Sequence, residues 1–208
     1  PTHSEVALQP LLPIGALSAT VTFSGGGAPT VTQEYRYARS WFREVNLEYD
    51  TVSDATAVTE YDTASHPNRP ATLPSERLTI ASTFGHMGIN VARSSGDSVI
   101  DVSSFTGADL RWSDVEMHDA MRVSWSRWAD IPQWAMWVLF ARLHERGPQL
   151  GGIMFDDIGA AQRQGCAIFS DSFISTAPGG DPAPAAWVQR MRFWTAVHEI
   201  GHCFNLAH

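Results

Sequence analysis

Residues 198–208 read His198-Glu199-Ile200-Gly201-His202-Cys203-Phe204-Asn205-Leu206-Ala207-His208 and contain a His-Glu-x-x-His pattern. His198 and His202 are four residues apart, so on a helix they lie one turn apart and point in nearly the same direction. Two imidazoles placed in this way can both bind one Zn²⁺ at ~2.0–2.1 Å. Glu199 lies about a quarter-turn away, where it can act as general base on a metal-bound water without being a ligand.

A third ligand is available from His208 if the chain leaves the helix and reverses after Cys203-Phe204. Such a reversal needs a residue that tolerates a positive φ, and Asn205 is the best non-glycine residue for that position. The sequence therefore predicts a zinc site made by His198, His202 and His208. The competing interpretation is a helix whose histidines cap, pack or form hydrogen bonds.

Hydrophobic periodicity upstream of this motif indicates a mixed α/β (α+β) domain over residues 34–208, preceded by an extension or linker over residues 1–33. Val45, Leu47 and Tyr49 alternate with polar residues, which is typical of a half-buried strand. An almost continuously apolar run over 134–141 indicates a strand buried on both faces. The predicted strands cover residues 44–50, 134–141, 152–155 and 166–169, with a further one over 19–23, and the predicted helices cover 78–89, 113–128 and about 185 into the motif.

Composition excludes several classes of protein. The 208 residues are 44% apolar and 17% charged, with a formal net charge of −8, which is typical of a globular domain. No apolar run approaches the ~18–20 residues of a membrane span. The acidic balance and the lack of a basic run argue against nucleic acid or an anionic membrane as a partner.

The motif resembles the signature of the metzincin clan of zinc metallopeptidases, His-Glu-x-x-His-x-x-Gly-x-x-His, with Asn205 in place of the glycine. The order of predicted strands and helices is similar to that of the clan's N-terminal subdomain. The resemblance implies a secreted endopeptidase with His198, His202 and His208 as ligands and Glu199 as base. It also implies a peptide substrate lying as an extended strand along Gly152, Ile153, Met154 and Phe155.

The clan's C-terminal subdomain, with its methionine turn, has no counterpart after His208. We therefore expect a missing C-terminal segment of the same protein as a partner. We also expect that this chain alone binds zinc weakly and turns over substrate slowly.

Further positions have less specific interpretations. Asp156 and Asp157, with the loop over 159–165, offer oxygen ligands for Ca²⁺, although a solvated loop is the simpler interpretation. Cys203 is expected to face away from the metal, either as a core thiol or in a bridge to Cys166. The tryptophans are expected in the core; they include Trp125, Trp128, Trp134, Trp137, Trp187 and Trp194.

Two functions remain open from the sequence. The first is a zinc-dependent metalloendopeptidase in which Glu199 activates a zinc-bound water. The alternative is a non-catalytic zinc-binding or protein-interaction domain on a metzincin scaffold. An intact Glu199 favours the first, because a non-catalytic descendant has no chemical need for that carboxylate.

Overall fold

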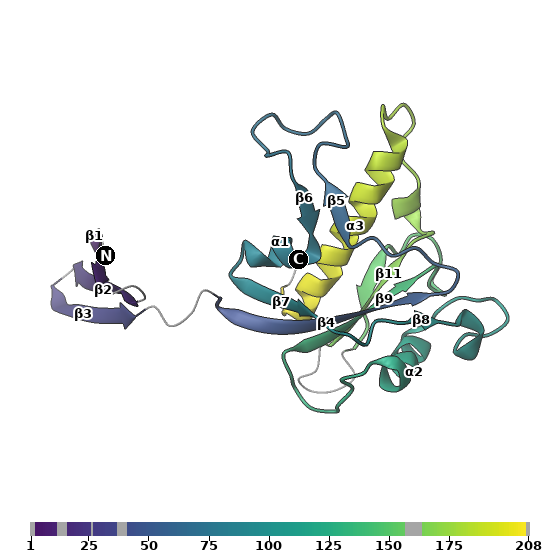
Figure 1. The fold of residues 1–208 in the computed structure, drawn as a ribbon, viewed down its shortest axis with the longest axis horizontal. Helices are drawn as coiled ribbons and strands as arrows, with labels where there is room; N and C mark the ends of the chain where they lie inside the picture. The colour runs from purple at the N-terminus through teal and green to yellow at the C-terminus, as the bar shows by residue number, and fades with distance from the viewer. Residues whose placement is uncertain (1–2, 12–15, 26, 37–40, 157–163, 207–208) are drawn as a thin grey trace. The chain divides into compact units, whose positions relative to one another are not determined.

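The computed structural model describes residues 3–11, 16–25, 27–36, 41–156 and 164–206, and the chain divides into two units, Pro1–Phe42 and Arg43–His208 (Figure 1). The sequence interpretation had placed this boundary after residue 33. The first unit is an antiparallel sheet of β1 (His3–Leu11), β2 (Ala16–Gly25) and β3 (Ala28–Arg36) in that spatial order. Only β2 was predicted, because Pro10 in β1 and Pro29 in β3 favour a linker over a strand.

The second unit is built on a mixed sheet with the strand order β10-β11-β9-β4-β7, and β8 also pairs with β4. All of its pairings are parallel except that of β10, which runs antiparallel to β11 at one edge. The strands are β4 (Arg43–Val52), β7 (Ile89–Arg93), β8 (Val99–Ile100), β9 (Ala135–Ala141), β10 (Gly152–Met154) and β11 (Gly165–Phe169). The predicted mixed α/β class is thus confirmed. The edge strand β10 consists of Gly152, Ile153 and Met154, which belong to the segment predicted to bind the substrate.

Helices cover both faces of this sheet, as the fully buried β9 requires (Figure 1). Met136, Val138 and Phe140 of β9 pack in one apolar cluster with α1 (Ile80–Gly85) and α3 (Pro184–Cys203). The alternate residues of β9 pack in a second cluster with α2 (Asp114–Ser124). A separate hairpin of β5 (Glu60–Asp62) and β6 (Arg77–Thr79) precedes α1, and short 3-10 turns lie at Val102–Ser104 and Phe173–Ser175.

The helix predicted over 78–89 is shorter than expected. Thr79 and Ser82 form a capping box that starts α1 at Ile80, with each side chain accepting the other's backbone N–H. The helix ends at Gly85, and Gly88 turns the chain with a φ of 77° before β7 begins. The sequence prediction therefore merged a short strand, a short helix and a turn into one element.

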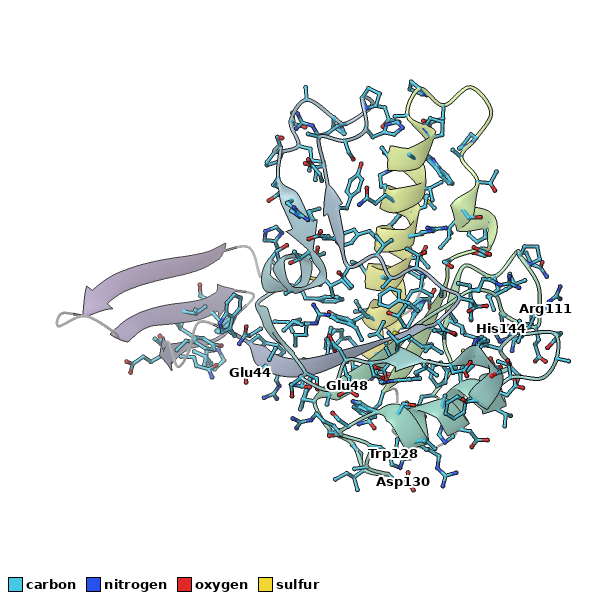
Figure 2. All side chains as sticks on the ribbon, turned by 45° about the vertical axis from the view of Figure 1, so that its right-hand side comes forward. Glu44, Glu48, Arg111, Trp128, Asp130 and His144 are labelled. Carbon is cyan, nitrogen blue, oxygen red and sulfur yellow. The ribbon has the colours of Figure 1, made fainter. Side chains whose placement is uncertain are left out.

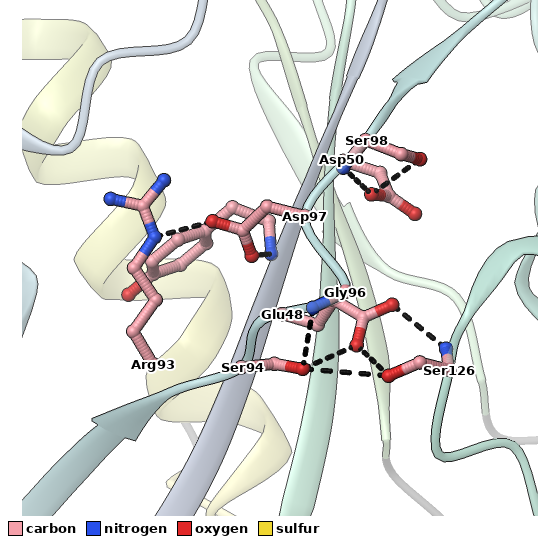
Figure 3. A network of polar contacts seen from close by, with 9 residues as sticks. Glu48, Asp50, Arg93, Ser94, Gly96, Asp97, Ser98 and Ser126 are labelled. Atoms are coloured by element: carbon pink, nitrogen blue, oxygen red, sulfur yellow. Dashed lines mark hydrogen bonds and ion pairs between the residues drawn. The ribbon is translucent and has the colours of Figure 1, made fainter.

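The strand β4 also differs from the half-buried strand that was predicted. Glu48 and Asp50 are fully buried. Glu48 lies on the side of the sheet where α2 lies (Figure 2), and Asp50 accepts a hydrogen bond from Trp137, which belongs to the apolar cluster on that side. Both carboxylates accept hydrogen bonds from serines of neighbouring loops (Figure 3). In β4, the alternation of apolar and polar residues therefore corresponds to two buried faces that are packed differently, and not to one buried face and one face in water.

Within the described part of the chain, no helix is long and apolar enough to cross a bilayer.

Candidate metal centre

The orientation of α3, and with it the direction of its motif, is set by the packing of one helix face in the core. Phe193, Ala196, Ile200 and Cys203 recur at spacings of three and four residues and are buried in the same cluster as β9. His198 lies on the opposite, exposed side of the helix. Packing of the apolar stripe therefore fixes the direction in which the motif's histidines point.

The end of α3 confirms the predicted chain reversal. Asn205 has a φ of 62°, in the left-handed region. The N–H of Leu206 donates to the carbonyl of Gly201 at 3.2 Å, and the N–H of Asn205 donates to that of His202 at 2.9 Å. This pair of bonds is the Schellman arrangement, which satisfies carbonyls that a helix end otherwise leaves unpaired.

His198 and His202 converge. Their Nε2 atoms are 3.0 Å apart, and their rings lie nearly perpendicular with centroids 4.5 Å apart. Two nitrogens bound to one tetrahedral Zn²⁺ lie about 3.3 Å from each other. The observed separation therefore fits two ligands of one ion.

The tautomer of His202 also suits metal binding. Its Nδ1 lies 2.7 Å from the backbone carbonyl of Leu206. Because a carbonyl oxygen only accepts, Nδ1 carries a proton, and the lone pair of the neutral ring is on Nε2, the atom that faces His198. A carbonyl that orients a histidine in this way is the usual outer-shell partner of a metal-bound imidazole.

Glu199 is buried beside the two histidines, with 7% of its surface exposed. This burial raises the pKa of Glu199 to about 7, and a hydrogen bond from the backbone N–H of Met154 opposes the rise. A carboxyl with a pKa near neutrality can both take and release a proton under ordinary conditions.

A cavity of about 630 Å³ opens in front of these groups. The edge strand β10 forms one wall, and α3 forms another with Trp194, His198, Glu199 and His202. Trp194 is 62% exposed and Phe173, also in the lining, is 52% exposed. Trp194 was predicted to lie in the core and does not. Trp194 lies on the same face of the helix as His198, four residues later, and this spacing could have predicted that Trp194 faces the cavity.

The predicted site residues are distributed as follows. His198, Glu199 and His202 lie together in the cavity with Gly152, Ile153 and Met154. Phe155 is 3% exposed and packs edge-on against Trp137, 6.2 Å between ring centroids, in the cluster on the α2 side. His208 lies outside the described residues, so the third ligand stays a prediction. Among the described residues, no group of three or more His, Cys, Asp or Glu side chains converges as a metal site.

The predicted calcium loop is described only in part, because Asp157 and residues 159–163 lie outside the described ranges. Asp156 is 1% exposed and accepts a hydrogen bond from the N–H of Gln164 at 3.0 Å. His118 Nδ1 lies 3.4 Å from the Asp156 carboxylate. A Ca²⁺ site in this loop stays a prediction.

The two cysteines are free and buried. Burial, together with contact with the Cys203 thiol, raises the pKa of the Cys166 thiol well above its usual range. Of the two alternatives left open by the sequence, the structure therefore contains core thiols. A buried thiol with a raised pKa is a poor nucleophile.

Sequence reasoning missed two backbone groups that position the motif, the Met154 N–H and the Leu206 carbonyl. Neither carries a side-chain signal, because every residue other than proline has the same donor and acceptor. No protein-family model matches this chain, and neither a curated protein nor a solved structure is significantly similar to it.

Proposed function

We propose that the Arg43–His208 unit is the metal-binding part of a zinc-dependent metalloendopeptidase with a metzincin-like N-terminal subdomain. The observation that carries the proposal is the 3.0 Å approach of His198 Nε2 and His202 Nε2 beside a buried carboxyl, Glu199. The antiparallel edge strand above the motif helix also supports it.

Zinc held by His198 and His202, with His208 as the predicted third ligand, would supply a Lewis acid that polarises a peptide carbonyl. Glu199 would take a proton from the attacking water and pass it to the leaving amine. A pKa of about 7 suits both transfers, because near neutral pH the group can accept a proton and also give it up.

The edge strand supports a peptide as the substrate. Phe169 N–H donates to the carbonyl of Gly151, and Phe155 N–H donates to that of Gly165, so Gly151 and Phe155 face β11. Backbone groups alternate along an antiparallel strand, so those of Gly152 and Met154 face away from β11. Because the Met154 N–H donates to Glu199, an extended peptide would pair with the backbone groups of Gly152 and with the Met154 carbonyl, regardless of its own side chains.

The test is a zinc titration together with cleavage of an unfolded protein, analysed by mass spectrometry. Glu199→Gln should lower hydrolysis about 10²–10⁴-fold, the usual contribution of a general base, while zinc is still bound. The matched control is Glu145→Gln, which removes the charge of an exposed glutamate outside the cavity lining. It should behave as the parent chain does.

The outcomes separate the two functions that the sequence left open. Cleavage by the parent that survives in Glu199→Gln would remove Glu199 from its role. Stoichiometric zinc binding with no cleavage by the parent would instead identify a non-catalytic zinc-binding domain. A chain that binds no zinc would contradict the peptidase and leave only a protein-interaction domain.

A further inference from the structure

Two glycines in a row, Gly151 and Gly152, lie where the edge strand meets the elements that line the cavity. A Cβ built on Gly152 would lie 2.6 Å from Cγ and 2.9 Å from Oε1 of Glu199, and 2.9 Å from the carbonyl oxygen of Ala167. Distances below 3.0 Å are closer than Cβ atoms approach other heavy atoms in real structures. No side chain can therefore stand at Gly152 while Glu199 keeps its place.

The same edge strand holds Glu199 by a hydrogen bond. The backbone groups of Met154 face away from β11, and its N–H donates to the Glu199 carboxylate. The strand thus contacts Glu199 at two alternate residues. The missing side chain of Gly152 leaves space that the Glu199 side chain occupies, and the Met154 N–H donates a hydrogen bond to the Glu199 carboxylate.

We propose that Gly152 is a positioning residue for Glu199. Its missing side chain lets the Glu199 carboxylate lie against the edge strand, at a fixed place beside the histidines. This inference rests on the proposed function. It assigns to the substrate-binding strand a second task, which is to hold the general base.

The first test is Gly152→Ala in the full chain. The added methyl group displaces the Glu199 carboxylate, and a misplacement of about 1 Å can cost about 100-fold in rate. We expect kcat to fall about 100-fold, with KM and the dissociation constant for zinc changed less than about threefold, because the backbone groups that pair with the peptide remain and neither histidine is touched. The control is Gly179→Ala, whose new Cβ meets no atom within 4 Å and should leave all three values unchanged.

The second test measures the contact without catalysis. Gly152→Ala should lower Tm by about 4–8 °C in the parent, equivalent to about 2 kcal/mol in a chain of this size. In a Glu199→Ala background the loss should be at most half as large, because only the contact with Ala167 remains. This thermal coupling does not depend on hydrolysis or on zinc.

Either of two results would overturn the positioning role: a kcat within threefold of the parent, or the same Tm loss in both backgrounds. A fall in zinc affinity that matches the fall in kcat would also overturn it, since the effect would then be general damage. A parent chain that hydrolyses nothing refutes the proposed function and this role with it. The Tm coupling would still show whether the packing contact exists.

Discussion

The structure buries carboxylates in two regions, and the two regions treat them differently. Glu48 on β4 accepts hydrogen bonds from the Ser94 hydroxyl at 2.7 Å and the Ser126 N–H at 2.8 Å, and also from the Ser126 hydroxyl (Figure 3). Glu199 on α3 accepts one from the Met154 N–H and borders a cavity. Burial alone therefore does not mark a reactive carboxyl. The number of donors and the access to open space separate the two.

The difference also shows what the sequence can reveal. Glu48 and Asp50 have the spacing of a polar strand face, yet they anchor the loop over 94–98 and Ser126, two residues after the end of α2. Both carboxylates therefore serve to tie loops to the sheet. Among the described residues Glu199 has one donor, and its pKa is raised to about 7, so it can exchange a proton near neutral pH.

The largest effect on stability should come from Glu48. Glu48→Ala leaves the Ser126 N–H and two serine hydroxyls without their acceptor at a fully buried position. We expect a loss of about 3–4 kcal/mol in the free energy of unfolding, because each unsatisfied buried donor costs about 1–3 kcal/mol. Glu199→Ala, which loses one backbone bond beside a cavity, should cost about 1 kcal/mol or less.

Urea unfolding followed by tryptophan fluorescence measures both losses, with Glu145→Ala as the exposed control. Equal losses for Glu48→Ala and Glu199→Ala would contradict the comparison. They would show that the cavity stabilises its carboxyl as strongly as the serine network does.

The same comparison explains which parts were predictable. The strand β9 and the helix α3 were predicted because both carry long, unambiguous apolar patterns. Asn205 was predicted from a local requirement, a positive φ at a chain reversal, and its φ of 62° confirms it. The convergence of His198 and His202 follows from helical spacing alone.

What could not be predicted depends on contacts between distant segments. The partners of Glu48 lie 46 and 78 residues away in the sequence. The clash between a side chain at Gly152 and Glu199 arises only when α3 packs beneath the sheet edge. Periodicity reports which face is buried, and it does not report which residue will lie opposite.

A smaller effect is expected from the pH dependence of Asp50. Burial raises the pKa of Asp50, and the neighbouring charge of Glu48 adds to the rise, while hydrogen bonds from Trp137 and Ser98 oppose it. The folded state therefore binds this proton more tightly than the unfolded chain does. The resulting stabilisation is complete below the ordinary pKa of an aspartate and is lost as the pH rises through the raised value.

Asp50→Asn removes that titration. The stability of the parent relative to Asp50→Asn should therefore be greater at acidic pH than at neutral pH, as measured by urea unfolding across this range. Exposed carboxylates titrate in both proteins and cancel in the difference. A difference that is constant with pH would show that the donors balance burial at Asp50, and one that grows towards neutral pH would show that they outweigh it.

The smallest effect is expected at Asn205, where the chain reverses after α3. Asn205→Ala places an ordinary residue at a φ of 62°, and the left-handed conformation costs such a residue about 1 kcal/mol. Asn205→Gly should keep the stability of the parent, because glycine adopts this conformation without strain.

The reversal also brings the Leu206 carbonyl into hydrogen-bond contact with His202. A loosened turn should therefore lower zinc affinity more than it lowers the stability of the fold. Thermal unfolding and zinc titration of the two variants test this order. Equal behaviour of the alanine and glycine variants would mean that the helix-end hydrogen bonds, and not the residue at position 205, hold the reversal in place.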